Sequence, residues 1–318
     1  MIKLILAVVF GFYLLIKGAD LFVDGISSTA INMKIPKLII SLTLVAFGTS
    51  TPELFISFRS ILTENNDIVF ANVVGSTIVN SMLVIGIAAI IRPLRIKNET
   101  IKKQLPLHLI MISAFAILFL DEIFNHTVNT ISRMDAVLLL LLFSSFLIYI
   151  YKFQKKNTSS NQLVNTPPKW SLGKSIIYSL IGLVLIYFGS NIAVDNCVNI
   201  ANALNIGQKL ITMIILVIGT STPEIVMAIT AAKKNEHDII IGNIIGTNIF
   251  NIGFVLGLPI LILGSVSSRS FNFADMFVMI TAAFIIYLFA KDDKKIDKLE
   301  GIIMIMVFIV YYAYLLLI

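Results

Sequence analysis

The sequence predicts an all-α membrane protein with ten transmembrane helices, built as two five-helix repeats of inverted topology in which helices 2 and 7 are broken. Its composition, its ten apolar runs and a motif that occurs twice support this prediction. Of the 318 residues, 58% are hydrophobic and only 13% are charged, whereas soluble domains have about 25% charged residues. A soluble fold of this size could not bury so much apolar surface, and a disordered chain would be polar. The composition therefore excludes a soluble enzyme and a disordered protein.

Ten apolar runs are candidates for transmembrane helices, because a spanning helix needs about 20 mostly apolar residues. They cover approximately residues 3–23, 36–62, 67–91, 104–123, 134–152, 174–196, 209–232, 239–264, 272–290 and 300–318. The first run follows Lys3 as in a signal peptide, but no small-residue cleavage motif comes after it. We therefore expect it to be a helix.

The basic residues lie mainly in alternate loops between these runs. The positive-inside rule makes the Lys-rich and Arg-rich side cytoplasmic, so we expect a multi-pass protein of the cell membrane with both termini extracellular. The net charge of +6 is split into short clusters rather than gathered on one face, so nucleic acid is not an expected partner. Cys197 is the single cysteine, and the three histidines are scattered. A disulfide framework and a Cys/His metal site are therefore excluded.

The hexapeptide GTSTPE occurs at residues 48–53 and again at 219–224, an offset of 171. The same offset aligns Asp67 with Asp238 and Gly86 with Gly257 without a gap, as expected for a duplicated unit. The units would cover residues 1–153 and 174–318, with cores at about 37–91 and 208–264, and the polar stretch 154–173 would be a cytoplasmic linker. Five is an odd number of helices, so the units must face opposite ways. Inverted repeats are typical of secondary transporters with an ion site at the membrane midplane.

Glu53 and Glu224 each lie deep within an apolar run, where a carboxylate costs a few kcal/mol. One interpretation is a structural carboxylate paired with Arg59, the nearest base within a span. The other is that both acids face one cavity and are neutralised by a cation. Pro52 and Pro223 precede the acids and leave backbone carbonyls without helical partners, and such irregular backbone is tolerated where it lines a cavity. We favour the cation site.

A second polar stripe follows in the next run of each unit. It comprises Asn72, Ser76 and Asn80 in the first unit and Asn243, Thr247 and Asn251 in the second. These residues could be hydrogen-bonding contacts between helices, but for Asn80 and Asn251 we favour the ion cavity. Every donor in the combined set is an oxygen, which suits hard cations such as Ca²⁺ and Na⁺. Competition of two ion species for the same two acids would produce exchange.

The twin GTSTPE strings, followed by ANVVGSTIVN and GNIIGTNIFN, resemble the alpha repeats of the sodium/calcium exchanger family. This family belongs to the cation/calcium antiporter superfamily. The short central loop is similar to that of prokaryotic members without a large regulatory domain. The resemblance implies Na⁺-driven Ca²⁺ antiport by alternating access, with the first and sixth helices sliding across the core. It implies a transporter that works as a monomer, has no enzymatic activity and needs no cofactor, with Ca²⁺ and Na⁺ as substrates and membrane lipid as its surroundings.

The resemblance also implies roles for individual residues. Glu53 and Glu224 would be the central calcium ligands, and the backbone carbonyls of Thr49 and Thr220 would add to that site. Sodium sites on either side would use Ser50, Ser76, Ser221 and Thr247, together with the carbonyls of Ala46 and Val217. Asn80 and Asn251 would sit at the centre of the cavity.

The sequence departs from the family pattern at three positions. Asn251 stands where some relatives have Asp, which argues against potassium coupling. Thr247 replaces the usual Ser, and Val217 replaces a small residue. The GTSTPE string favours sodium over proton coupling, yet H⁺/Ca²⁺ antiport stays open because desolvated acids can carry protons. A cation channel or a non-transporting membrane scaffold is the alternative from another class.

Overall fold

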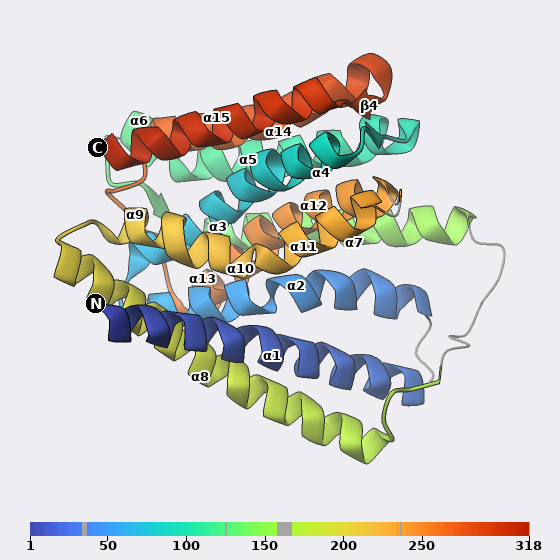
Figure 1. Ribbon diagram of the computed structural model, residues 1–318, viewed down its shortest axis with the longest axis horizontal. Coiled ribbons are helices and arrows are strands. Elements are labelled where there is room, and N and C mark those ends of the chain that lie inside the picture. The colour runs from blue at the N-terminus through green and yellow to red at the C-terminus, as the bar shows by residue number, and fades with distance from the viewer. Residues whose placement is uncertain (34–36, 125, 158–166, 234, 236, 318) are drawn as a thin grey trace.

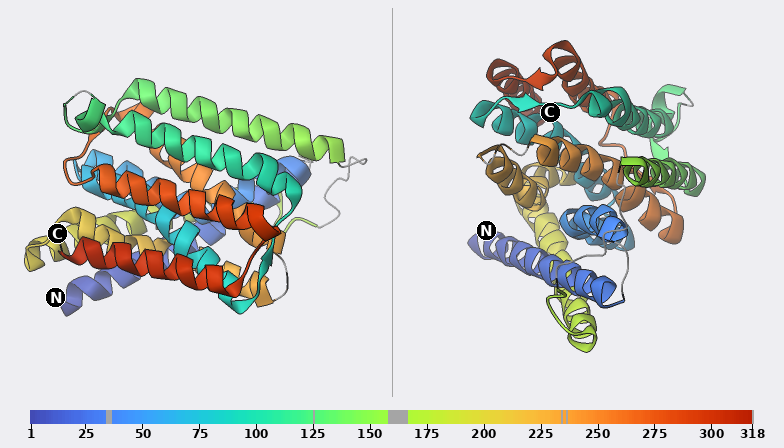
Figure 2. Two further views of the ribbon diagram at one scale, coloured as in Figure 1. Left: turned by 90° about the horizontal axis from the view of Figure 1, so that it is seen from above. Right: turned by 90° about the vertical axis from the view of Figure 1, so that its right-hand side faces the viewer.

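The computed structural model describes residues 1–33, 37–124, 126–157, 167–233, 235 and 237–317. It is a bundle of long helices that run parallel or antiparallel to one another (Figures 1 and 2). Among the described residues, eight helices are long and apolar enough to cross a membrane, and a bent pair makes up to nine. The expected second span, 36–62, is not among them, because most of its first half lies where no side chains are described.

The described elements are mostly helices, with four strands of two residues each. They are α1 (Ile2–Asn32), α2 (Lys37–Leu62), α3 (Asn66–Ile78), η1 (Val79–Val84), α4 (Ile85–Ile91), β1 (Leu94–Arg95), η2 (Thr100–Gln104), α5 (Leu105–Phe119), α6 (Asp121–Phe124), β2 (Thr130–Ile131), α7 (Arg133–Asn157), α8 (Leu172–Leu204), α9 (Gln208–Ile211), η3 (Thr212–Leu216), α10 (Val217–Thr220), α11 (Thr222–Lys233), α12 (His237–Phe250), η4 (Asn251–Leu256), α13 (Gly257–Leu263), β3 (Val266–Ser267), α14 (Phe273–Asp293), β4 (Lys295–Ile296) and α15 (Lys298–Leu317). The four η segments are π-helical. Most of the expected linker, residues 158–166, lies outside the described residues.

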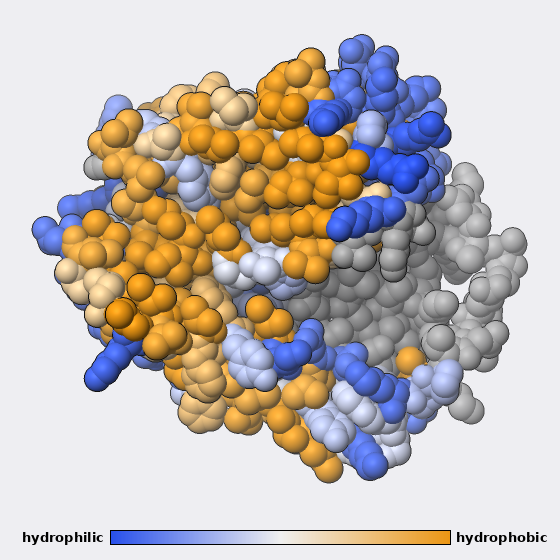
Figure 3. All heavy atoms as spheres, viewed as in Figure 1, coloured by the Kyte–Doolittle hydropathy of each residue, from blue (hydrophilic) through white to orange (hydrophobic). Residues whose placement is uncertain are grey.

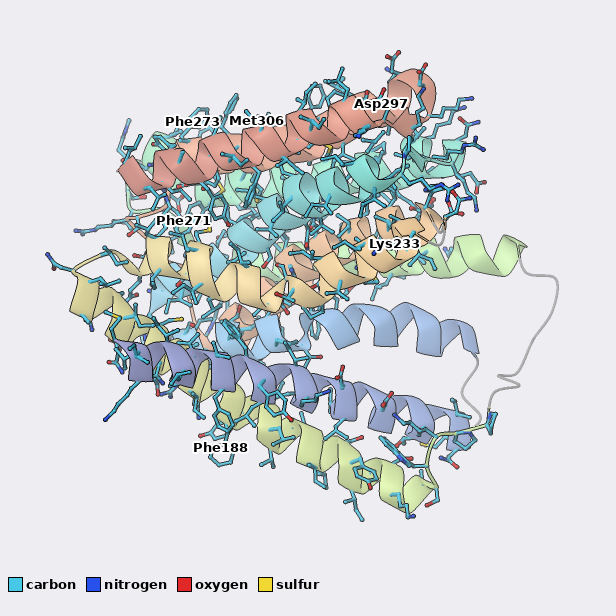
Figure 4. The ribbon with its side chains drawn as sticks, in the orientation of Figure 1. Phe188, Lys233, Phe271, Phe273, Asp297 and Met306 are labelled. Carbon is cyan, nitrogen blue, oxygen red and sulfur yellow. The ribbon has the colours of Figure 1, made fainter. Side chains whose placement is uncertain are left out.

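A hydrophobic belt covers the middle of the bundle, and hydrophilic residues gather toward its ends (Figure 3). Phe188 on α8 and Met306 on α15 lie between the ends with exposed side chains, whereas Asp297 lies at one end and Phe273 toward the other (Figure 4). This arrangement is that of a multi-pass membrane protein, because the apolar side chains outside the core face lipid. The N-terminus and the last described turn lie at the same end of the bundle (Figure 1).

Two spans form the centre of the bundle. They are α3–η1–α4 and α12–η4–α13, and 78% of the most apolar stretch of each is buried, against 39% or less in the other spans found. The two π-helical segments occupy equivalent positions in the halves, since Val79–Val84 and Asn251–Leu256 are separated by about the repeat offset. A π-helical turn widens the helix locally and is frequent at functional sites. The central spans are therefore the place to look for the ion site.

α1 and α8 pack against each other along their lengths, to one side of the rest (Figures 1 and 2). They run antiparallel, because Gly11 lies against Gly189 and Gly18 lies against Gly182. A Cβ atom at Gly11 would lie 2.8 Å from the backbone nitrogen of Ala193, and one at Gly18 would lie 2.8 Å from the carbonyl oxygen of Gly182. Glycine at these positions lets the two backbones touch.

Two short strand pairs join the first half of the chain to the second. β1 pairs with β4, and β2 pairs with β3, both antiparallel. Beside them, the Asp67 carboxylate accepts hydrogen bonds from Ser268 and Ser270, and its equivalent Asp238 forms an ion pair with Lys97 at 2.7 Å. The hydrogen bond that the Lys97 ammonium donates to Asp238 raises the pKa of Lys97 above its ordinary value. The two halves are thus tied together outside the membrane core as well as inside it.

Helix 7 is broken as expected, but the structure contradicts the expected break in helix 2. The seventh span bends by 45° between Gln208–Thr220 and Thr222–Lys233. Pro223 stands in the first turn of α11, where the missing N–H has no helical partner to lose. Pro52 instead lies inside a continuous α2. A single proline removes one hydrogen bond without ending a membrane helix when neighbouring groups satisfy the freed carbonyl.

Lys209 forms a buried ion pair at the start of the seventh span. Its Nζ atom donates to Asp275 Oδ2 at 2.6 Å and to the carbonyl of Ser270 at 2.9 Å, and only 9% of its side chain is exposed. The Tyr311 hydroxyl donates to Asp275 Oδ1 at 2.7 Å. The acid therefore fastens α9, α14 and α15 together.

Replacement of this acid tests the fastening. Asp275→Asn leaves the Lys209 ammonium buried without its counter-charge, which costs about 3–5 kcal/mol. We expect the thermal unfolding midpoint of the detergent-solubilised protein to fall by several degrees. Asp293→Asn, which breaks the exposed pair with Lys295, is the matched control and should cost less than about 1 kcal/mol. Equal midpoints for the two variants would contradict the assigned role of Asp275.

Candidate ion-binding site

Glu53 on α2 and Glu224 on α11 come together in the interior, and their exposed fractions are 2% and 1%. The two carboxyl groups are close enough to interact electrostatically, and the Glu53 carboxyl is hydrogen-bonded to the side chain of Thr220. α2 packs against α12 and η4 of the second half, and α11 packs against η1 and α4 of the first. Each acid therefore reaches the centre from a helix that crosses the central span of the other half.

Arg59 does not neutralise Glu53. Its guanidinium donates to both carboxylate oxygens of Asp195 on α8, at 2.9 and 3.1 Å. Glu53 Oε2 has no hydrogen-bond partner among the described residues. The interpretation of Glu53 as a structural carboxylate paired with Arg59 is therefore wrong. Two desolvated acids side by side are costly unless a cation lies between or beside them.

Asn72 holds the helix that carries Glu53. Its amide nitrogen bonds to that helix and does not line the cavity. Its Nδ2 atom donates to the backbone carbonyl of Glu53 at 3.0 Å and lies 3.2 Å from the hydroxyl of Ser57. The sequence left open whether the polar residues of this span bind ions or make contacts between helices. Asn72 makes a contact between helices. It anchors α3 to α2 at the residue that carries the charge.

Asn80 and Asn251 lie within the π-helical segments η1 and η4, and each is 1% exposed. Their amide oxygens have no hydrogen-bond partner among the described residues. The same holds for the buried hydroxyls of Ser50, Ser76 and Thr247. Buried oxygens without partners are rare in folded proteins. A set of them around two acids fits the ligand shell of hard cations.

The donor set is chemically uniform. Among the described residues, no group of three or more His, Cys, Asp or Glu side chains is placed to hold a metal ion. The charge available is that of two carboxylates, and the remaining donors are hydroxyl and amide oxygens. Such a set can surround Ca²⁺, or several Na⁺ ions that share the same acids.

The remaining expected ligands have three different outcomes. Thr220 and Ser221 lie buried at the bend between α10 and α11, beside the acids. The Val217 carbonyl accepts a bond from Ser221 N at 2.9 Å and lies 3.2 Å from the Thr220 hydroxyl, so a cation would have to displace one of these contacts. Ala46 and Thr49 lie in α2, but their side chains fall outside the described residues.

Sequence reasoning missed one buried cluster beside the site. Asn80 Nδ2 donates to the side chain of Asn248, which in turn contacts Ser81 and His108. The scattered positions of the histidines gave no ligand spacing. The signal that could have revealed the cluster is a loss of repeat symmetry, because the offset of 171 aligns Asn248 with Thr77, and His108 with Met279.

Comparison with known proteins assigns the chain to a protein family. A family model described as "Sodium/calcium exchanger protein" matches residues 3–152 and 174–317. The chain belongs to the sodium/calcium exchanger family. The family is one of membrane transporters rather than enzymes, and its name gives Na⁺ and Ca²⁺ as substrates.

Full-length relatives of this exchanger-family chain include the "Putative antiporter CaxA" of Alkalimonas amylolytica, 34% identical over 312 residues and 96% of both chains. The "Sodium/calcium exchanger MaX1" of Methanosarcina acetivorans is 29% identical, with 98% of this chain and 97% of that one covered. Among solved structures, the sodium-calcium exchanger NCX_Mj soaked with 10 mM Na⁺ and 10 mM Sr²⁺ is similar with a TM-score of 0.67 and 30% identity, covering 98% of this chain and 99% of that one. The likeness supports cation/Ca²⁺ antiport.

Replacement of Arg59 separates the two interpretations of Glu53, namely a structural carboxylate paired with Arg59 and a cation ligand. Arg59→Gln removes a partly exposed ion pair between α2 and α8, which is worth less than about 1 kcal/mol, and leaves Glu53 and Glu224 unchanged. We expect Ca²⁺-dependent thermal stabilisation of the purified protein to stay at the wild-type level. Loss of that stabilisation in Arg59→Gln, with unfolding otherwise unchanged, would return Arg59 to the site.

Proposed function

We propose that this protein exchanges Na⁺ for Ca²⁺ across the cell membrane by alternating access, with the cations bound at a single midplane site made by both halves. The observation that carries the proposal is the meeting of Glu53 and Glu224, buried and electrostatically coupled, from equivalent helices of the two halves. Two acids balance one divalent ion, and the same acids are needed by Na⁺. One species must therefore leave before the other binds, which is the requirement for antiport.

The proposed architecture is ten helices in two inverted five-helix repeats. The glycine contacts between α1 and α8 support it, because Gly11 meets Gly189 and Gly18 meets Gly182, and the offset of 171 carries Gly11 to Gly182 and Gly18 to Gly189. Such reciprocal contacts arise when two copies are related by a two-fold axis. The strand pairs, each with one strand from either half, support the same relation.

We propose that both termini are extracellular, since an even number of spans places them on one side and the positive-inside rule selects that side. Residues 154–173 then lie in the cytoplasm. The Lys clusters on that side contact anionic lipid. The protein works as a monomer without a cofactor, because one chain supplies both acids.

The proposed ligands are assigned by chemistry and position. Glu53 and Glu224 bind Ca²⁺ together with the carbonyls of Thr49 and Thr220, and Asn80 and Asn251 lie at the centre. Na⁺ binds at sites completed by Ser50, Ser76, Ser221 and Thr247, with the carbonyls of Ala46 and Val217.

H⁺/Ca²⁺ antiport is the second candidate. The proximity of the two buried acids favours it, since adjacent desolvated carboxyls can hold a proton in place of a metal ion. The name of the relative from Alkalimonas amylolytica, "Putative antiporter CaxA", gives no coupling ion.

Reconstitution into liposomes separates the candidates. With the pH clamped on both sides, an outward Na⁺ gradient should drive uptake of ⁴⁵Ca²⁺. Uptake that ignores Na⁺ and follows a pH gradient would establish the second candidate instead. Unitary currents without counter-ion coupling would mean a channel and would overturn both.

Removal of either central charge should abolish transport. Glu53→Gln and Glu224→Gln keep the shape of the side chain but leave the site with one negative charge, too few to balance Ca²⁺. We expect ⁴⁵Ca²⁺ uptake at the background level of empty liposomes, with normal membrane insertion. Glu64→Gln, in the exposed turn after α2, is the control and should transport as the wild type does. Wild-type flux in either central variant would remove that acid from the site.

Addition of a third acid should change the ion selectivity. Asn251→Asp places a carboxylate in η4, next to two existing charges, and raises the charge that the bound cations must balance. We expect the concentration dependence on Na⁺, K⁺ or H⁺ to shift while Ca²⁺ still binds. Competition curves against ⁴⁵Ca²⁺ uptake measure the shift, and curves identical to those of the wild type would place Asn251 away from the cations.

A further inference from the structure

A buried hydrogen-bonded cluster adjoins the candidate site on one side. Asn80 Nδ2 donates to Asn248 Oδ1 at 3.1 Å. Asn248 Nδ2 donates to Ser81 Oγ at 3.0 Å and lies 3.1 Å from His108 Nε2. Asn80 is 1% exposed and the other three are fully buried. The cluster joins η1, α12 and α5 at the residue that we place at the centre of the ion cavity.

His108 lies near the middle of its span, Thr100–Phe119. A polar ring at that depth is costly unless its partners satisfy it. Its Nε2 atom contacts Asn248, and its other nitrogen, Nδ1, has no hydrogen-bond partner among the described residues. The ring therefore fills a place that an apolar side chain could take at lower cost.

The repeat equivalents of these residues in the other half of the chain are largely apolar. The offset of 171 aligns His108 with Met279 and Ser81 with Ile252, both fully buried and apolar. It aligns Asn248 with Thr77, whose hydroxyl donates to the carbonyl of Val73 in its own helix at 2.8 Å. Three polar residues thus occur together on one side, whereas the equivalent positions carry two apolar residues and a threonine that bonds within its own helix. Their common presence indicates one shared role.

The donors and acceptors of the cluster define that role. An amide nitrogen only donates, so Ser81 Oγ and His108 Nε2 act as acceptors toward Asn248. The Asn248 oxygen is then the acceptor for Asn80, which commits the Asn80 nitrogen to Asn248. Asn80 Oδ1 is left without a partner among the described residues, as a cation ligand must be. A reversed Asn248 amide would draw the Asn80 oxygen away and turn N–H groups toward the cations.

We propose that His108, acting through Asn248, is a positioning residue that fixes the Asn80 amide with its oxygen directed into the ion site. The inference rests on the proposed function, since it assigns an orientation to one ligand of that site. It also makes the halves unequal. Asn80 is held by Asn248, which Ser81 and His108 orient in turn. The equivalent residues of the other half, Thr77, Ile252 and Met279, cannot hold Asn251 in the same way.

The test uses His108→Met, which installs the residue of the other half and removes the acceptor. His108→Gln places an amide oxygen where Nε2 was and can accept the Asn248 bond again. Met279→Leu is the matched control in the other half. Two measurements are made on each full-length protein, namely the KM and maximal rate of ⁴⁵Ca²⁺ uptake in liposomes, and the thermal stabilisation of the purified protein by Ca²⁺, Sr²⁺ and Na⁺.

When the Asn80 amide is reversed, its oxygen does not face the ion site. The apparent affinity for Ca²⁺ falls in proportion to the fraction of protein that keeps the binding orientation. We therefore expect His108→Met to raise the KM for Ca²⁺ by about 3- to 10-fold, with a maximal rate within about twofold of the wild type. His108→Gln should restore the KM, and Met279→Leu should leave it unchanged. If His108→Met does not fold, Asn248→Thr carries the same expectation.

The outcomes keep this inference distinct from the proposed function. A wild-type protein that is stabilised by cations, together with a His108→Met variant of unchanged KM, would overturn the positioning role alone. A His108→Gln variant as defective as His108→Met would also overturn it, because the acceptor would not matter. A wild-type protein that none of the three cations stabilises would overturn the proposed function and this inference together.

Discussion

The structure depends on the electrostatic cost of two carboxylates that face each other away from water. Two bases of the described spans serve other acids: the guanidinium of Arg59 donates to Asp195, and the ammonium of Lys209 donates to Asp275. Buried charges of one sign are tolerated only when something else supplies the opposite sign. The surrounding oxygens, several without protein partners, suit that missing cation. The same cost explains why exchange is obligatory in the proposed mechanism, since an empty site would leave two like charges close together.

Close backbone contacts bring the rest of the fold to these acids. Glycines let α1 lie directly on α8, and the ring of Phe12 on α1 lies where a side chain at Gly219 would be, with a ring atom 2.6 Å from the position of its Cβ. α1 therefore contacts the bend of the seventh helix next to Thr220. Asn72 holds the backbone of Glu53 from the neighbouring helix. A displacement of the outer pair would thus be felt at the ligands through contacts of a few ångströms rather than through long linkages.

The duplicated units have diverged where symmetry is not needed. The pair of Lys209 with Asp275 has Leu38 and Gln104 at the equivalent positions, and these two residues cannot form an ion pair. The cluster of His108, Asn248 and Ser81 likewise exists on one side. The acids, the hydroxyls beside them and the two asparagines in π-helical segments are present in both halves. Duplication thus supplies the paired acids and the oxygens beside them, while the one-sided polar clusters determine how firmly each half is held.

The sequence by itself determined the membrane class and most of the spans, because hydrophobic runs are local patterns. The repeated hexapeptide, also a local pattern, predicts the two-unit organisation and the two acids of the site. The sequence misjudged helix 2, since a proline does not by itself reveal whether neighbouring groups satisfy the carbonyl it frees. Only the tertiary structure decided which base serves which acid, that Lys209 is buried, and that Asn248 and His108 adjoin the site. These contacts join residues 136 positions apart for Arg59 and Asp195, and 140 apart for Asn248 and His108. No local periodicity encodes such pairs, because they exist only once the two halves pack together.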